Sequence, residues 1–145
     1  MNAVPRMTEP GGVAWKQTTF FPFAVTSRLA GVTALTTRIE SDTYESSVHG
    51  TVNQIDSAVT SDVSGTSVFL VNRGVSEAST VTIDISALGA VAVVEAVALY
   101  DDDIHAANTL AAPERVQLRD IEWTIADSTL TIELPPVSWV ALRVE

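Results

Sequence analysis

The stretch Thr129-Leu130-Thr131-Ile132-Glu133-Leu134 alternates an apolar side chain with threonine or glutamate at every second position. This period of two predicts a half-buried β-strand, with one face toward a core and the other toward solvent. The stretch 80–85 repeats the pattern. Two further runs, 68–71 and 90–99, are almost continuously apolar, which is typical of strands covered on both faces.

Short strands are expected through most of the remaining chain. Valine, isoleucine and threonine make up 45 of the 145 residues, and lysine occurs once, so the composition favours strand over helix. Further strands are predicted at 34–40, 44–48, 51–60, 115–119, 121–125 and 138–144, with turn-forming residues between them. About seven or more short strands at this spacing predict an all-β fold, an antiparallel β-sandwich of Greek-key or jelly-roll type.

One short helix, roughly 16–30, is predicted before the strands, in a segment crowded with aromatic and aliphatic residues. Pro22 lies inside this range, so the helix either starts near Phe21 with Pro22 in its first turn or is kinked there. Gly31 offers a stop in a left-handed conformation. The stretch 100–114 has no period and is predicted to be one long loop.

Composition excludes several classes of function. The absence of cysteine rules out disulfides, zinc ribbons and thiol nucleophiles. A formal charge of −10 disfavours nucleic acid and anionic membrane surfaces as partners. We find neither an apolar run of about 18 residues nor the pattern of a signal peptide, so a cytoplasmic protein is expected. No nucleotide-binding motif is present, and no cofactor is expected.

No catalytic or metal site can be assigned from the residues. Asp101-Asp102-Asp103-Ile104-His105 is the densest group of candidate metal ligands; a calcium site is one interpretation, and a solvated acidic loop is the favoured one. His49, beside a glycine, is predicted to be a turn or strand-edge residue. A glycosidase needs two carboxylates, one with a raised pKa. The candidates, none in an apolar setting, are Glu40, Asp42, Glu45, Asp84 and Glu133.

The three tryptophans could stack on sugar rings if they were exposed, as in a carbohydrate-binding module. Core packing is the favoured use for all of them. Trp123 alternates with Ile121 and Ile125 and is predicted to face the core. Trp139 points away from the apolar face of its strand and is the better candidate for a surface or interface residue.

The segment 7–23 resembles a signature of α-L-arabinofuranosidases of glycoside hydrolase family 51. Its residues are Met7-Thr8-Glu9-Pro10-Gly11-Gly12-Val13-Ala14-Trp15-Lys16-Gln17-Thr18-Thr19-Phe20-Phe21-Pro22-Phe23. Short motifs similar to those of the family follow across the whole chain. They are Thr43-Tyr44, Asp56-Ser57-Ala58, the stretch from Phe69 to Arg73, the stretch from Asp101 to Thr109, and the stretch from Leu134 to Trp139.

The resemblance implies that residues 1–31 are the end of a catalytic (β/α)₈ barrel and that 32–145 are the C-terminal β-sandwich. It also implies that both catalytic glutamates lie outside these residues, so the chain alone is expected to be inactive. Gln17 matches a family glutamine that reaches the sugar-binding subsite and is the one expected substrate contact, in the parent enzyme. For the isolated chain, the favoured interpretation is a polar residue at the helix N-terminus without a ligand. The parent would be a retaining glycosidase that removes terminal α-L-arabinofuranosyl groups from arabinan, arabinoxylan or oligosaccharides.

The resemblance implies partners as well. These are the protein's own barrel, arabinose-containing saccharides and further copies in a homo-oligomer. In the family, chain from the far N-terminus joins the sandwich, so residues 1–145 alone are expected to leave a sheet edge unpaired. The alternative hypotheses are a carbohydrate-binding module and a purely structural sandwich.

Overall fold

The computed structural model describes residues 11–89 and 91–145. Residues 1–10, part of the expected barrel end at 1–31, and Ala90 lie outside the described residues. The elements in chain order are α1 (Phe20–Leu29), β1 (Thr33–Leu35), β2 (Thr43–Ser46), β3 (Gly50–Asn53), β4 (Ile55–Asp62), β5 (Gly65–Asn72), β6 (Ser79–Asp84), the 3₁₀ turn η1 (Ser86–Leu88), β7 (Val93–Leu99), β8 (Leu118–Asp120), β9 (Trp123–Ala126), β10 (Thr129–Leu134) and β11 (Ser138–Val144).

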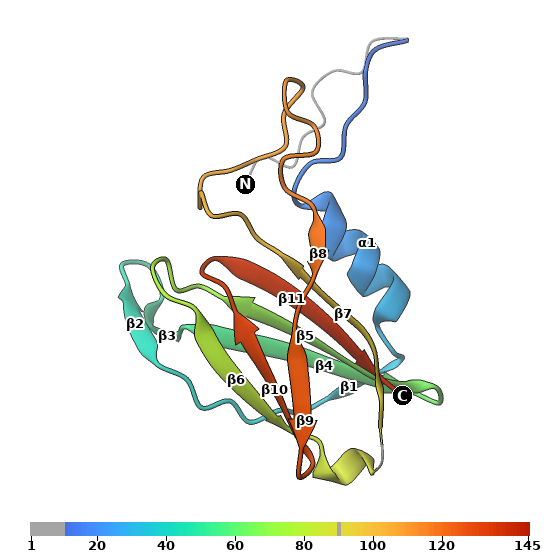
Figure 1. Ribbon diagram of the computed structural model, residues 1–145. Helices are drawn as coiled ribbons and strands as arrows, with labels where there is room; N and C mark the ends of the chain where they lie inside the picture. Colours follow the sequence, from blue (N-terminus) through green and yellow to red (C-terminus); the bar gives the residue numbers. More distant parts are fainter. Residues whose placement is uncertain (1–10, 90) are drawn as a thin grey trace.

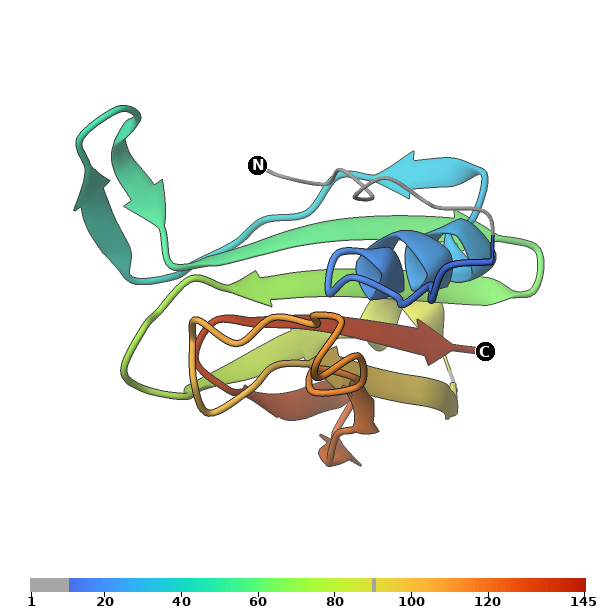
Figure 2. The same ribbon diagram turned by 90° about the horizontal axis from the view of Figure 1, so that it is seen from above.

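The strands form a sandwich of two antiparallel sheets (Figures 1 and 2). The larger sheet has the order β1-β4-β5-β11-β7-β8 and the smaller sheet the order β6-β10-β9. A separate hairpin, β2–β3, extends to one side of the sandwich. The predicted all-β antiparallel sandwich with one preceding helix is confirmed. The predicted strand 51–60 divides between β3 and β4, and only Thr33–Leu35 is regular near 34–40.

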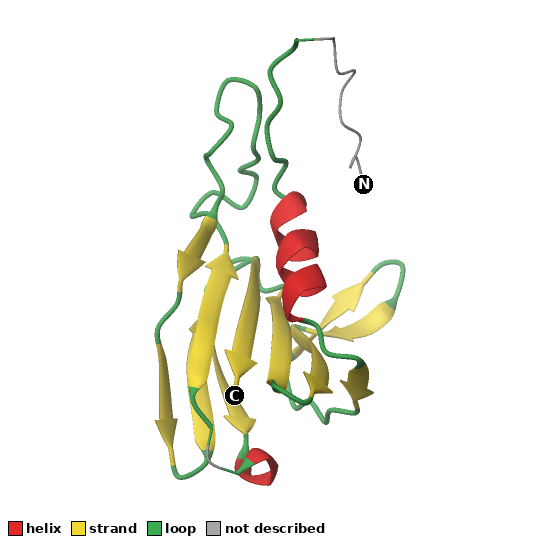
Figure 3. Ribbon diagram, turned by 90° about the vertical axis from the view of Figure 1, so that its right-hand side faces the viewer, coloured by secondary structure: helices red, strands yellow, loops and turns green. Residues whose placement is uncertain are grey.

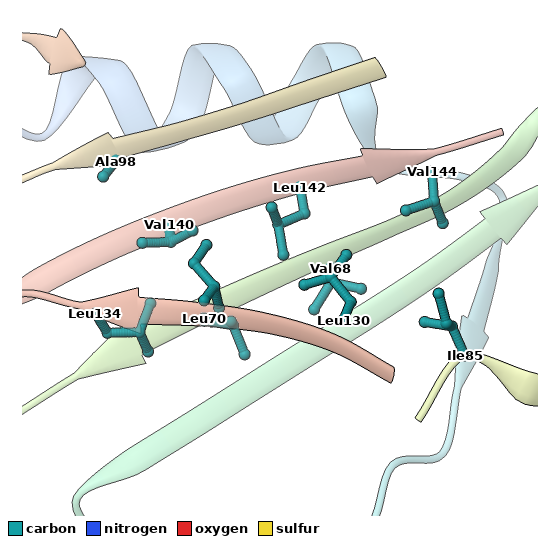
Figure 4. Close-up of a cluster of buried hydrophobic side chains, with 10 residues drawn as sticks. Val68, Leu70, Ile85, Ala98, Leu130, Leu134, Val140, Leu142 and Val144 are labelled. Carbon is teal, nitrogen blue, oxygen red and sulfur yellow. The ribbon is translucent and has the colours of Figure 1, made fainter. Parts of the chain in front are cut away.

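The sandwich interior lies between the central strands β5 and β11 of the larger sheet and β10 of the smaller sheet (Figure 4). Inward side chains alternate along each strand, as the period of two requires. The buried members of this cluster are Val68, Leu70, Ile85, Ala98, Leu130, Ile132, Leu134, Val140, Leu142 and Val144. The alternation in 129–134 therefore identified the core face of β10 correctly.

The opposite face of the larger sheet is covered by α1 (Figure 3). Val25 and Leu29 of the helix pack against Phe69 of β5 and Ala141 of β11. Trp139 lies at the margin of this contact, stacked on Phe69 with 6.2 Å between ring centroids. The prediction that Trp139 points away from the sandwich interior is confirmed, and the surface that it joins is the helix–sheet interface.

The ends of α1 follow from local chemistry. The helix begins at Phe20, and Pro22 lies in its first turn, where a missing N–H removes no helical hydrogen bond. The prediction of a left-handed Gly31 is wrong, because Gly31 does not have a positive φ. A β-carbon there would overlap the backbone carbonyl of Ser61, so glycine allows the chain to pass close to β4.

A buried arginine ties the end of α1 to the sheet. Arg143 Nη1 donates to the Leu29 carbonyl (3.4 Å) and to Ser67 Oγ (3.1 Å), and Ser67 Oγ donates to the same carbonyl. Arg143 Nη2 donates to Asp62 Oδ1 at 2.8 Å and to Ser64 Oγ. A cation at a helix C-terminus interacts favourably with its free carbonyls. These contacts therefore fix the position of α1 on the sheet.

The prediction for Trp123 is correct about the face of the strand but wrong about its burial. Trp123 pairs with Ile132, and Ile125 with Leu130, so both lie on the inner face as their spacing predicted. Trp123 is nevertheless 39% exposed, because β9 is the outer strand of the smaller sheet and its inner face is only partly covered.

Replacing Leu142 with alanine should lower the free energy of unfolding by about 2 to 5 kcal/mol, since a fully buried leucine would leave a cavity. Urea denaturation followed by circular dichroism measures the change. Val48→Ala in the exposed β2–β3 turn is the control and should change the stability by about 0.5 kcal/mol or less. A similar small loss for Leu142→Ala would contradict the assignment of the core.

Asp62 should make stability depend on pH. Hydrogen bonds from Arg143 and Ser64 hold the pKa of its carboxyl well below the ordinary value. A lowered folded-state pKa stabilises the protein above the unfolded-state pKa, near pH 4, and this contribution is lost as the pH falls further. The melting temperature of wild type should therefore fall more steeply from pH 5 to pH 2 than that of Asp62→Asn, with Asp102→Asn as control. Parallel curves for wild type and Asp62→Asn would refute this role.

Candidate functional site

The segment that precedes α1 runs beside the long loop between β7 and β8, and both project beyond the sheets (Figures 1 and 3). The loop occupies 100–117, close to the predicted 100–114. Residues 12–17 have no regular secondary structure, so side-chain contacts must determine their conformation. This segment contains Gln17, the one residue for which the sequence suggested a substrate contact.

Asn108 is the main contact between the two segments. Its Nδ2 donates to the Lys16 carbonyl at 3.0 Å, and its backbone N–H donates to Thr18 Oγ1 at 3.3 Å. Its carbonyl accepts a hydrogen bond from Trp15 Nε1 at 3.3 Å. Asn108 thus binds residues on both sides of Gln17.

Asn108 also closes its own loop. Nδ2 donates to the Val116 carbonyl at 2.9 Å, and Oδ1 accepts from the Val116 N–H at 2.7 Å. Both the asparagine and Val116 are buried. The side chain thereby provides hydrogen-bond partners for these buried polar groups. Leaving such a group without a partner would cost about 1 to 3 kcal/mol. No sequence pattern predicted this role, because an asparagine in a polar loop is ordinary.

Gln17 itself is partly buried, and its carbonyl accepts the N–H of Phe20 at 2.9 Å as the chain enters the helix. Within residues 11–89 and 91–145, its side-chain amide makes no hydrogen bond. Lys16 lies over the Phe20 ring, with Nζ 5.1 Å from the centroid. The chain around Gln17 is therefore held by neighbouring contacts, while its side-chain amide is not used in a hydrogen bond to any other described residue.

The acidic stretch 101–105 is ordered by its own hydrogen bonds. Arg115 Nη2 lies 3.3 Å from Asp101 Oδ1 and 3.2 Å from Asp103 Oδ2. The Asp103 N–H and then Arg115 lower the pKa of Asp101, and Asp103 Oδ1 accepts the N–H of His105. The described part of the chain holds no group of three or more candidate metal ligands. Here the carboxylates shape the loop that presents Asn108.

The candidate carboxylates lie in three different parts of the described structure. Glu40, Asp42 and Asp84 line a groove, Glu45 accepts a hydrogen bond from Thr51 in the β2–β3 hairpin, and Glu133 is exposed on β10. A general acid needs a raised pKa. Among the described residues, the carboxyls with a displaced pKa are all lowered by hydrogen bonds; they are Asp62, Asp84, Glu95 and Asp101.

The groove, of about 740 Å³, lies between β6 and the segment 36–42. Its floor consists of apolar residues of β4 and β5, including Val59 and Val68, and no aromatic residue lines it. Sugar-binding surfaces of carbohydrate-binding modules depend on aromatic stacking. The groove therefore lacks the feature that would mark a saccharide site.

The remaining candidate residues do not form a site together. His49 lies in the turn of the β2–β3 hairpin, as predicted, and His105 is exposed on the long loop. Trp15 is engaged with Asn108, and Trp139 is stacked on Phe69 beside α1. Trp123 lies on β9 of the smaller sheet and Trp139 on the α1 side of the larger sheet, so these two do not share a surface.

Comparison with known proteins identifies the family. A model of the α-L-arabinofuranosidase C-terminal domain matches residues 1–138. The chain is 43% identical to an exo-α-(1→6)-L-arabinofuranosidase of Bifidobacterium longum and 41% identical to an intracellular exo-α-(1→5)-L-arabinofuranosidase of Streptomyces lividans. These matches cover 97% and 96% of this chain but only 28% and 21% of the relatives.

A solved structure agrees. The family 51 α-L-arabinofuranosidase of Bifidobacterium longum superposes with a TM-score of 0.87 at 35% identity, over 94% of this chain and 27% of that one. In sequence and in structure, the chain therefore spans only about a fifth to a quarter or slightly more of the relatives that it matches: 28%, 21% and 27%. The chain belongs to the family of C-terminal domains of family 51 α-L-arabinofuranosidases.

Proposed function

We propose that these residues are the non-catalytic C-terminal part of a retaining α-L-arabinofuranosidase, which removes terminal α-L-arabinofuranosyl groups from arabinan, arabinoxylan or derived oligosaccharides. The observation that carries the proposal is that the chain matches relatives of this activity over nearly its whole length while spanning only 21% to 28% of theirs.

In this proposal residues 1–31 complete the catalytic barrel and 32–145 form the sandwich. The exposed face of α1 supports the division, since Phe23 is 76% exposed and Phe20 is exposed beside it. Large aromatic side chains grouped on a helix indicate a surface that another part of the protein covers. The barrel is the partner assigned to that face.

Gln17 is the proposed substrate contact of this segment. Its amide has hydrogen-bonding capacity to spare, and neighbouring residues are fixed by Asn108. A primary amide can donate to one sugar hydroxyl and accept from another. Gln17 would thus help to orient the arabinofuranosyl group while residues outside the chain perform the chemistry.

The free edge of β6 is the proposed place where N-terminal chain of the parent joins the sandwich. β6 pairs with β10 along one edge, and its other edge borders the groove, without a strand partner among the described residues. An added strand would satisfy the open backbone groups and cover the apolar floor.

A cytoplasmic location is proposed for the parent, because relatives from Streptomyces lividans and Bifidobacterium longum are named intracellular enzymes. Within the described residues, no helix is long and apolar enough to span a bilayer. A homo-oligomer is proposed from the family resemblance.

The isolated 145-residue chain should not hydrolyse an aryl α-L-arabinofuranoside, whereas the full-length protein should. The reason is that the catalytic carboxylates are assigned to the barrel. Release of the aryl group, followed by absorbance, measures both proteins. Turnover by the purified chain, after contaminating glycosidases are excluded, would refute the division of labour.

Hydrogen exchange should reveal the open edge of β6. In an antiparallel strand about half of the amides point to each side, so the β6 amides that do not face β10 should exchange fast in the isolated chain. They should become protected in the full-length protein, while the central strand β11 is protected in both. Equal protection of all sandwich strands in the isolated chain would exclude a missing strand.

A further inference from the structure

Asn108 is a buried polar residue that makes more hydrogen bonds than are needed to close its own loop. It is 6% exposed, and the pair of hydrogen bonds with Val116 already closes the loop. Three further bonds reach Trp15, the Lys16 carbonyl and Thr18, all within two residues of Gln17. The side chain of Asn108 binds the Lys16 carbonyl, and its backbone carbonyl and N–H bind Trp15 and Thr18, so this one residue of the sandwich contacts the chain on both sides of the proposed substrate contact.

The chemistry of these bonds requires an amide. Nδ2 donates to two carbonyl oxygens, those of Lys16 and Val116, while Oδ1 accepts from the Val116 N–H. Aspartate has nearly the same shape but no donor, so its carboxylate would face both carbonyl oxygens. A glutamine is longer by one methylene and would displace the segment.

We propose that Asn108 is a positioning residue for Gln17, through which the loop 100–117 of the sandwich sets the geometry of the sugar-binding subsite. This inference rests on the proposed function, because it takes Gln17 as a substrate contact. Asn108 does not touch substrate. It acts by binding the Lys16 carbonyl and the side chains of Trp15 and Thr18. The ion pairs of Arg115 with Asp101 and Asp103 hold the loop in turn.

The structure supplies a matched control in Asn72. It is 2% exposed, its Nδ2 donates to the carbonyls of Leu134 (3.1 Å) and Pro135 (3.0 Å), and its Oδ1 accepts the N–H of Gly74 at 2.8 Å. Asn72 is thus another buried amide that closes turns with the same kind of bonds. It has no hydrogen bond with residues 15–18.

The test compares Asn108→Asp, Gln17→Ala, their double variant and Asn72→Asp in the full-length protein on an aryl α-L-arabinofuranoside. Asn108→Asp should lower kcat/KM by about 10- to 100-fold, since small misplacements of a contact have effects of this size. The double variant should be no worse than the more impaired single variant, because both changes remove the same interaction. Asn72→Asp should lower the melting temperature without a comparable loss of kcat/KM.

Thr18→Val provides a milder variant if Asn108→Asp does not fold, since it removes only the acceptor of the Asn108 N–H. It should lower kcat/KM in the same direction. Wild-type kcat/KM in folded Asn108→Asp or in Thr18→Val, multiplicative losses in the double variant, or a Gln17→Ala variant with unchanged kcat/KM would each overturn the inference. A full-length wild type that is inactive on the glycoside would instead overturn the proposed function on which it rests.

Discussion

Burial of both faces of the β5–β11 pair is the constraint on which the rest of this structure depends. Inward residues such as Val68 and Leu142 face β10, while Phe69 and Ala141, on the opposite face, receive α1. A ten-residue helix is marginal in water alone, and the apolar face of the three-stranded sheet needs a second layer to cover it. The smaller sheet and α1 therefore pack on opposite faces of the same two strands, and this joins the sandwich to the proposed end of the barrel.

Polar contacts then fix the position of the N-terminal segment on the larger sheet. Apolar packing is not directional, whereas hydrogen bonds from Arg143 to the Leu29 carbonyl and from Asn108 to the Lys16 carbonyl hold individual backbone atoms. One contact lies at the end of α1 and the other lies before its start. Between them they connect the sandwich to both ends of the segment, which contains the proposed substrate contact Gln17.

Sequence patterns predicted best where a residue's environment depends on its immediate neighbours. The strand 129–134 and the strand 138–144 were placed at their observed bounds, because alternation specifies a face. The prediction for Trp123 gave the correct face but the wrong exposure, since coverage depends on strand order and β9 is an outer strand. Gly31 was assigned a left-handed turn, and its actual requirement, contact with Ser61 from β4, is tertiary.

The alternation of apolar residues, the composition and the local motifs were enough to predict an antiparallel sandwich preceded by a short helix, and to show a resemblance to the C-terminal part of a longer glycosidase. They could not predict that α1 covers the outer face of β5 and β11, or that Asn108 binds both sides of Gln17. The Asn108 bonds join residues about ninety positions apart in sequence. No local pattern specifies which distant polar groups will meet when apolar surfaces are buried.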